Sequence, residues 1–240
     1  MAVDIKKGVN LDLHPDTVTT IEGYDDDVAI YLQPTREAFN AAYQFIGNIY
    51  EVRAAAMADP TLTPAAALLK ADDYAQQRLS GVTRKFDTVM ANLAKSIAHL
   101  ENELAAPVKA RASLMVSGEV RAAMKAADNR MALVQKAIAE GDEEVASAVL
   151  GAPALLSGMS REMHQHLLVM YHSAREPAKA AQLRAMRGAK ERLEQRSGLV
   201  FREMTKAVGT LKHPNTGQPI HPQDLRKRRD ASAAAYAQLA

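Results

Sequence analysis

The chain has 240 residues, with 5% aromatic residues and no cysteine or tryptophan. The lack of cysteine excludes disulfides, thiolate metal sites and thiol nucleophiles, and it predicts a reducing compartment. The net charge of +2 by itself indicates neither nucleic acid nor an acidic substrate as a partner. Alanine, leucine, methionine, glutamate, lysine, arginine and glutamine dominate the composition, and because these residues favour helices we expect an all-α fold.

Residues 1–33 are predicted to form an arm outside the helical body. Apolar clusters at 18–21 and 28–32 are separated by a run rich in glycine and aspartate. Short apolar clusters on either side of such a turn are typical of a small hairpin or an extended segment. Because an isolated two-stranded ribbon is marginal in water, this arm needs a surface of its own subunit or of a neighbour to lie on.

Within this arm, Asp25, Asp26 and Asp27 form a candidate partner-binding cluster. Seven acids and two lysines give residues 1–33 a net charge of −5, whereas residues 212–240 have a net charge of +3. Ends of opposite charge attract one another between neighbouring subunits, and salt screens that attraction. Two solvated termini are the alternative interpretation. Three consecutive acids lack the alternating oxygens of an EF-hand, so we do not expect calcium there.

Two long amphipathic helices are expected in the middle of the chain. The first begins near Pro34 and ends near Ala58. The second restarts at Pro64, after a threonine cap, and continues to about Ala105, with Pro107 ending or kinking it. Its apolar residues recur at close to the 3.5-residue spacing of a coiled coil. At about 1.5 Å per residue this helix spans roughly 60 Å, so we expect it to project from a globule or to pack along a partner.

Shorter helices follow, with clear start and stop signals. One begins at Ser117, and a break with a new cap falls at Gly141-Asp142. Ser160 is the predicted cap of a helix through about Ala174. The last long helix runs from Pro177 to a C-cap at Gly209. Two glycines inside it are expected to mark close helix contacts; they are Gly188 and Gly198.

The end of the chain is predicted to be a tail hinged by prolines, with a short helix at Asp224–Leu239. Four consecutive cations near the start of that helix oppose its dipole and therefore indicate a partner; they are Arg226, Lys227, Arg228 and Arg229. A solvated basic turn is the first interpretation, and of the two partner interpretations an acidic protein surface is favoured over nucleic acid. The predicted organisation is an arm (1–33), a helical bundle domain (34–211) and a basic tail (212–240), together an elongated all-α bundle.

No motif for catalysis or cofactor binding is present. The chain has no Gly-rich phosphate loop, no G-x-S-x-G elbow and no Glu-x-x-His pair. The best metal candidates lie on the helix after Ser160; they are Glu162, His164, His166 and His172. Of these, Glu162 and His166 alone have the helical spacing of two zinc ligands, so we expect no metal site. His213 and His221, beside prolines, are expected to be solvated. We therefore expect no enzyme activity and no cofactor.

The segment Ala137–Gly158, AIAEGDEEVASAVLGAPALLSG, resembles a segment of uncharacterised helical proteins encoded by tailed bacteriophages. The resemblance covers a small part of the chain and carries over no functional residue. It implies a virion or assembly component, such as a scaffold, a head–tail connector or an internal protein.

These observations together predict a non-enzymatic structural or assembly protein that self-associates through its helical seams. Its expected partners are further copies of itself and other structural proteins of an assembly. A helical protein that associates with nucleic acid through the basic tail is the alternative. The chain has no apolar run that could span a bilayer and no apolar signal segment, so we expect it in the cytoplasm or within a virion.

Overall fold

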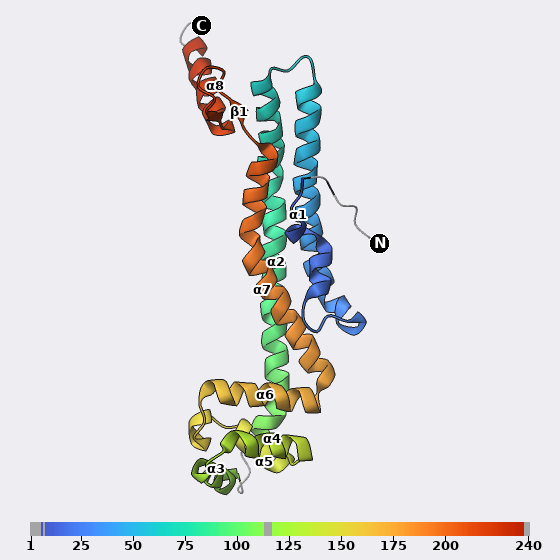
Figure 1. Ribbon diagram of the computed structural model, residues 1–240, viewed down its shortest axis with the longest axis vertical. Helices are drawn as coiled ribbons and strands as arrows, with labels where there is room; N and C mark the ends of the chain where they lie inside the picture. Colours follow the sequence, from blue (N-terminus) through green and yellow to red (C-terminus); the bar gives the residue numbers. More distant parts are fainter. Residues whose placement is uncertain (1–5, 7, 113–116, 238–240) are drawn as a thin grey trace. The chain divides into compact units, whose positions relative to one another are not determined.

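The computed structural model describes residue 6 and residues 8–112 and 117–237, which are helical apart from turns and one short ribbon (Figure 1). The α-helices are α1 (Asp26–Ala58), α2 (Pro64–Ala112), α3 (Ser117–Ala126), α4 (Arg130–Glu140), α5 (Glu143–Leu150), α6 (Arg161–Arg175), α7 (Pro177–Val208) and α8 (Pro222–Ala237). Short 3-10 helices lie at Leu11–Leu13, Pro15–Thr20 and Ala154–Ser157. The all-α class with long helices is confirmed.

The chain divides into two compact units that interleave along the sequence. Unit 1 holds the residues up to Thr20, Leu32–Ala91 and the residues from Ala189 onward, and unit 2 holds Ile21–Tyr31 and Asn92–Gly188. The boundaries fall inside α1, α2 and α7. This division follows packing, whereas the three segments predicted above follow composition along the chain.

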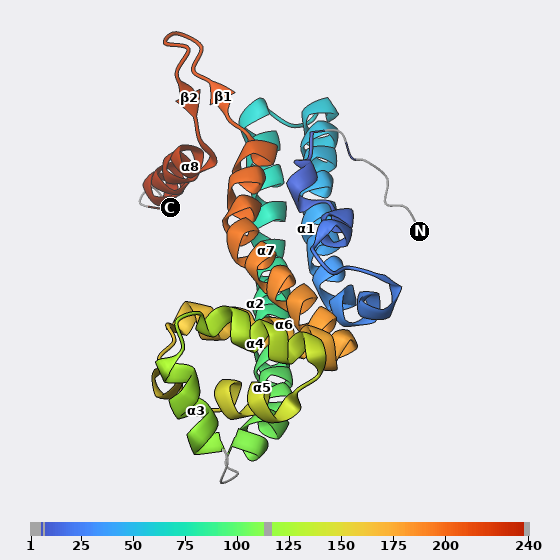
Figure 2. The same ribbon diagram turned by 60° about the horizontal axis from the view of Figure 1, so that its bottom comes forward.

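The core of unit 1 is a bundle of α1, α2 and the second part of α7 (Figures 1 and 2). The rings of Phe39 and Phe86 meet edge to face, with centroids 5.5 Å apart, and join α1 to α2. Arg53 of α1 donates a hydrogen bond to the carbonyl of Ala207, which joins α1 to α7. Further buried residues of this core are Tyr43, Ile46, Ile49, Leu68, Leu193 and Val200. Their three- and four-residue spacing within each helix produces the apolar stripe that the bundle buries.

The N-terminal residues pack on this bundle as 3-10 turns, and the hairpin or extended arm expected from the sequence is wrong for the residues described. Leu13 and Val18 are fully buried. Arg192 of α7 donates to the Thr17 carbonyl and, at 2.7 Å, to the hydroxyl of Thr20. Backbone carbonyls that the local turns leave without a partner accept hydrogen bonds from arginines of α7.

Helix α1 begins eight residues earlier than Pro34, at Asp26. The Asp25 carboxylate accepts a hydrogen bond from the Val28 backbone at 2.8 Å and so caps the helix. Val28 and Leu32 are both buried, four residues apart, which is a helical spacing. The expected strand-like cluster at 28–32 is therefore helical. Pro34 lies inside the helix, where its missing N–H costs one backbone hydrogen bond.

Helix α2 continues past Pro107 to Ala112 and does not end near Ala105 as expected. A proline inside a helix costs about 3 kcal/mol. Burial of Val108 and Ala112 in unit 2 opposes that cost, since each apolar side chain removed from water contributes about 25 cal/mol per Å². The turn after α5 lies directly against this end of α2: a Cβ on Gly151 would overlap the Val108 carbonyl.

The caps predicted for unit 2 are confirmed, and one further break was not predicted. Gly141 ends α4 with a φ of +80°, and Asp142 caps α5 through a 3.0 Å hydrogen bond from Val145. Ser160 caps α6 by accepting from Met163 at 3.1 Å. The segment after Ser117 breaks before Asn129, which caps α4. The core of this unit contains Val134, Val149, Leu167 and Tyr171.

The two glycines of α7 differ in their surroundings. A Cβ on Gly188 would lie 2.7 Å from the side chain of Ile21, so this glycine does permit a close contact, with the segment before α1. No atom lies within 4 Å of the corresponding position on Gly198. The expected close contact is therefore found at Gly188 alone of the two.

A short ribbon joins α7 to α8. Helix α7 ends at Val208 and is followed by the predicted C-cap Gly209, which has a φ of +74°. Strands β1 (Leu211–Lys212) and β2 (Pro219–Ile220) then pair antiparallel, with Leu211 opposite Ile220 (Figure 2). The proline-rich connector is thus a small hairpin between α7 and α8.

Candidate functional site

Helix α8 contributes almost nothing to the core. Its described side chains are exposed except for three half-buried ones in its first turns, Pro222, Leu225 and Arg226. The run of small residues Ala231–Ala235 is exposed throughout. A 16-residue helix without tertiary burial is marginal in water, because most helix stability in proteins comes from packing of one face. This helix is therefore a candidate interaction surface.

Arg226 attaches α8 to α2 within unit 1. Its Nε and Nη2 donate to Asp72 Oδ2 at 3.1 and 2.5 Å, and Nη2 also donates to Asp73 Oδ1 at 2.5 Å. Asp72 is only 7% exposed. Hydrogen bonds from Arg226 to Asp72 and Asp73 raise the pKa of the guanidinium, so the group is charged at every relevant pH. Arg226, predicted to contact a partner, has carboxylate partners in its own chain.

The other three residues of the basic patch are exposed. Arg229 pairs with Asp230 at 3.2 Å. Lys227 and Arg228 line a 360 Å³ pocket beside the ribbon, together with His213 and Asp224. His213 therefore belongs to the wall of a small polar pocket, where its Nδ1 accepts from the backbone of Thr216 at 3.3 Å.

The acidic cluster has a local structural role. Asp25 caps α1, and Asp26 and Asp27 occupy the first turn of this helix, where the helix dipole favours negative charge. All three side chains are exposed. The cluster belongs to unit 2 and the basic patch to unit 1. Sequence reasoning identified the acids by their charge and missed the cap, although Asp three residues before an apolar position is a helix-start signal.

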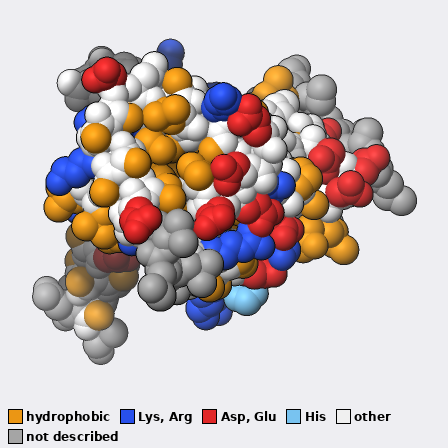
Figure 3. Space-filling model, turned by 90° about the horizontal axis from the view of Figure 1, so that it is seen from below, with side chains coloured by type: hydrophobic (Ala, Val, Ile, Leu, Met, Phe, Trp, Pro, Cys, Tyr) orange, Lys and Arg blue, Asp and Glu red, His pale blue; other side chains and the backbone are white. Residues whose placement is uncertain are grey.

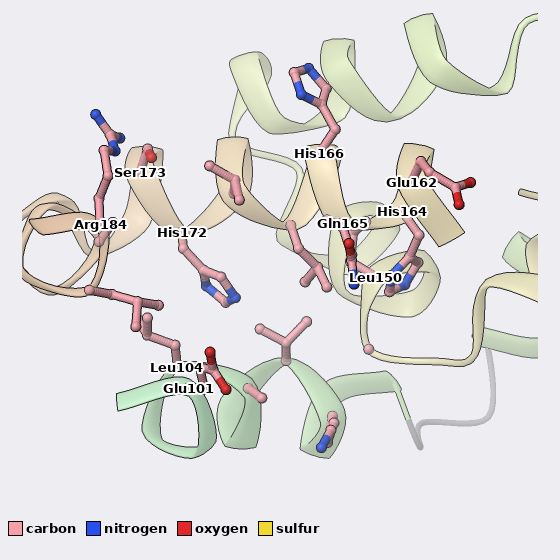
Figure 4. A pocket seen from close by; sticks show the side chains of 18 of the residues that line it. Glu101, Leu104, Leu150, Glu162, His164, Gln165, His166, His172, Ser173 and Arg184 are labelled. Carbon is pink, nitrogen blue, oxygen red and sulfur yellow. The ribbon is translucent and has the colours of Figure 1, made fainter. Parts of the chain in front are cut away.

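A groove of about 1020 Å³ lies in unit 2, and we call it the α6 groove. Helix α6 forms one wall and the end of α2 the opposite wall, with the first turns of α7 and the turn after α5 at its ends (Figure 4). Its apolar lining includes Leu104, Val108, Leu150, Val169 and Leu183. Val169 is 48% exposed. At the mouth, Arg187 donates to Glu101 at 2.6 Å.

The histidines considered as metal ligands lie on the wall of this groove. The rings of His164 and His172 point from α6 into it, whereas the ring of His166 points away (Figure 4). Burial lowers the pKa of His172, against the opposing charge of Glu176. His164 Nε2 is buried without a hydrogen-bond partner. Among residues 6, 8–112 and 117–237, no three His, Asp or Glu side chains are placed to hold a metal ion.

Exposed apolar side chains extend beyond the groove. A neighbouring hollow of about 510 Å³ shares Pro153, His164 and Gln165 with it and adds Leu155, which is 80% exposed. A face viewed from below shows hydrophobic side chains gathered between acidic and basic ones (Figure 3). Such contiguous apolar surface is typical of interaction sites. Sequence periodicity missed the groove because its walls come from helices far apart in the chain.

Comparison with known proteins adds no relative: no protein-family model, no curated protein and no solved structure matches the chain. In the part of the chain that the structure describes, no helix combines the length and the apolar character needed to cross a membrane.

Proposed function

We propose that this protein is a non-enzymatic assembly protein that forms homo-oligomers through helix α8. The observation that carries this proposal is the exposure of residues 227–235 of α8, with the Arg226 ion pairs as its attachment to α2. The helix propensity of alanine alone gives a helix of this length little stability in water. Contact with another copy supplies the burial that its own unit does not.

Charge supports a second copy as the partner. Residues 212–240 have a net charge of +3 and residues 1–33 one of −5, so copies attract one another through different surfaces. An interface between two different surfaces of one chain propagates to a ring or a filament. The resemblance of residues 137–158 to phage helical proteins agrees with such a role, in a virion or in its assembly.

Breaking α8 tests this proposal. Ala234→Pro removes a backbone donor in the exposed half of the helix, and Ala234→Ser is the matched control that keeps a small side chain on a helix. Light scattering after size-exclusion chromatography, over a range of concentrations, is expected to show oligomers for the native chain and for Ala234→Ser and loss of oligomers for Ala234→Pro. A native chain that is monomeric at all concentrations contradicts the proposal.

Nucleic-acid association is the second candidate, since Lys227 and Arg228 are exposed cations. Phosphate contacts release counterions, so binding weakens steeply with salt. A mobility-shift titration with duplex DNA at several salt concentrations is the test. The variant Lys227→Gln/Arg228→Gln is expected to reduce both affinity and salt slope if the tail binds phosphates. Binding unchanged by this variant argues against a role for the tail.

A further inference from the structure

We infer that the α6 groove receives the uncharged second half of α8 from another copy of the chain. This inference rests on the proposed self-association through α8, and it names the surface on which α8 docks.

The groove has the properties of a helix-binding surface. Its volume of about 1020 Å³ lies just above the usual range for small-ligand sites, about 300–1,000 Å³. Its lining is mainly aliphatic, and Val169 and Leu155 expose large apolar areas in and beside it. Grooves of this kind between helices accept the apolar face of a further helix.

The second half of α8 matches the groove in length and size. Residues 231–237 are ASAAAYA and carry no charge. At about 1.5 Å per residue they span about 10 Å, and the groove wall of α6 from His164 to His172 spans about 12 Å. Small side chains allow two helix axes to approach closely, which lets an alanine face reach the aliphatic floor between α2 and α6.

The charges of the groove favour an uncharged occupant. Arg187 is paired with Glu101 and Arg184 with Glu22, at 2.6 and 3.6 Å, so these two cations are neutralised within the chain. Lys109 and Glu162, both exposed, also line the groove and carry one charge of each sign. Hydrogen bonds from its own backbone and from Ser160 lower the pKa of Glu162, so this carboxylate is charged.

The second half of α8 suits such a groove. Its uncharged run begins after Asp230, so the alanines can lie over the apolar floor without burying a charge. The neutral imidazole of His172, on the groove wall, imposes no charge on the occupant.

Cysteine cross-linking tests this docking directly, because the native chain has no cysteine. Full-length protein with Ala234→Cys is mixed with full-length protein carrying Val169→Cys, and a short bismaleimide is added. A covalent dimer of the two variants is expected. The matched control replaces Val169→Cys with Leu133→Cys, a side chain 46% exposed on α4 and outside the groove, and its dimer yield is expected to be at least tenfold lower.

A second pair of variants separates this inference from the proposed function. Val169→Glu puts a charge in the groove at an exposed position that the fold tolerates, and Leu133→Glu is its control. Weakening of oligomers by at least tenfold in Val169→Glu alone supports docking in the groove. Oligomers that persist in Val169→Glu, with no cross-link at Val169→Cys, overturn the groove as the site and leave assembly through α8 intact. If the native chain forms no oligomers, both the proposed assembly through α8 and the docking of α8 in the groove are wrong.

Discussion

Arg226 of α8 and Asp72 of α2, 154 residues apart, form a forked ion pair in which two guanidinium nitrogens donate to one carboxylate oxygen. Asp72 is nearly buried, and Gln76 donates to its other oxygen at 3.4 Å. The pair gives α8 a defined attachment point although the helix buries little apolar surface. It also explains why the first cation of the basic run differs in role from those that follow it.

Removal of this attachment is expected to free α8 more than it unfolds the protein. Arg226→Gln leaves the Asp72 carboxylate with a neutral partner, and because Arg226 is itself partly exposed the loss in unfolding free energy is about 1 kcal/mol. Limited proteolysis is expected to cut the tail several times faster. Arg229→Gln, at an exposed pair, is the control and is expected to leave the cleavage rate unchanged.

Gly151 is expected to tolerate no side chain. Gly151→Ala places a methyl group against the Val108 carbonyl, and the backbone shift that relieves this overlap is expected to cost about 1–3 kcal/mol of unfolding free energy. Gly198→Ala is the matched control: this helical position has no neighbour within 4 Å, so alanine is expected to stabilise by about 0.5–1 kcal/mol. Urea denaturation of both variants measures the difference. Equal effects would contradict the close approach of Gly151.

The cap of α1 is expected to contribute measurably to stability. Asp25→Ala removes the acceptor for the Val28 backbone N–H and is expected to cost about 1 kcal/mol. Asp27→Ala, in the first turn, loses only the dipole interaction, with an expected cost of about 0.3 kcal/mol. Thermal unfolding followed by circular dichroism gives the comparison. A larger loss for Asp27→Ala than for Asp25→Ala would contradict the capping role.

Acidification is expected to destabilise the protein through His172. Its pKa is lowered in the folded state from the ordinary 6.5 because burial disfavours the imidazolium. The unfolded state therefore binds the proton more readily, so stability is greatest above pH 6.5 and falls as the pH drops through the lowered pKa. His172→Gln is expected to flatten the pH dependence of the urea midpoint in this range. His166→Gln, whose ring points away from the groove, is the control (Figure 4).

Much of the helical architecture was predictable from local chemistry. Ser160, Asp142 and Gly209 mark helix ends by their side-chain acceptors or by a positive φ, and these effects act over three or four residues. The helix boundaries predicted from proline were wrong. Pro34 and Pro107 both lie inside helices, because the cap at Asp25 and the burial of Val108 each outweigh the loss of one backbone hydrogen bond.

The candidate surfaces, like the helix boundaries, were predictable only where they depend on residues close together in the chain. The sequence by itself determined the helical class, most caps and the chemical character of the tail, since each depends on residues close together in the chain. Only the tertiary structure decided that Arg226 pairs with Asp72 and that His164 and His172 line an apolar groove with Val108 and Leu183. Those relationships join residues that are distant in sequence, and they depend on helix packing, which apolar periodicity allows in many arrangements.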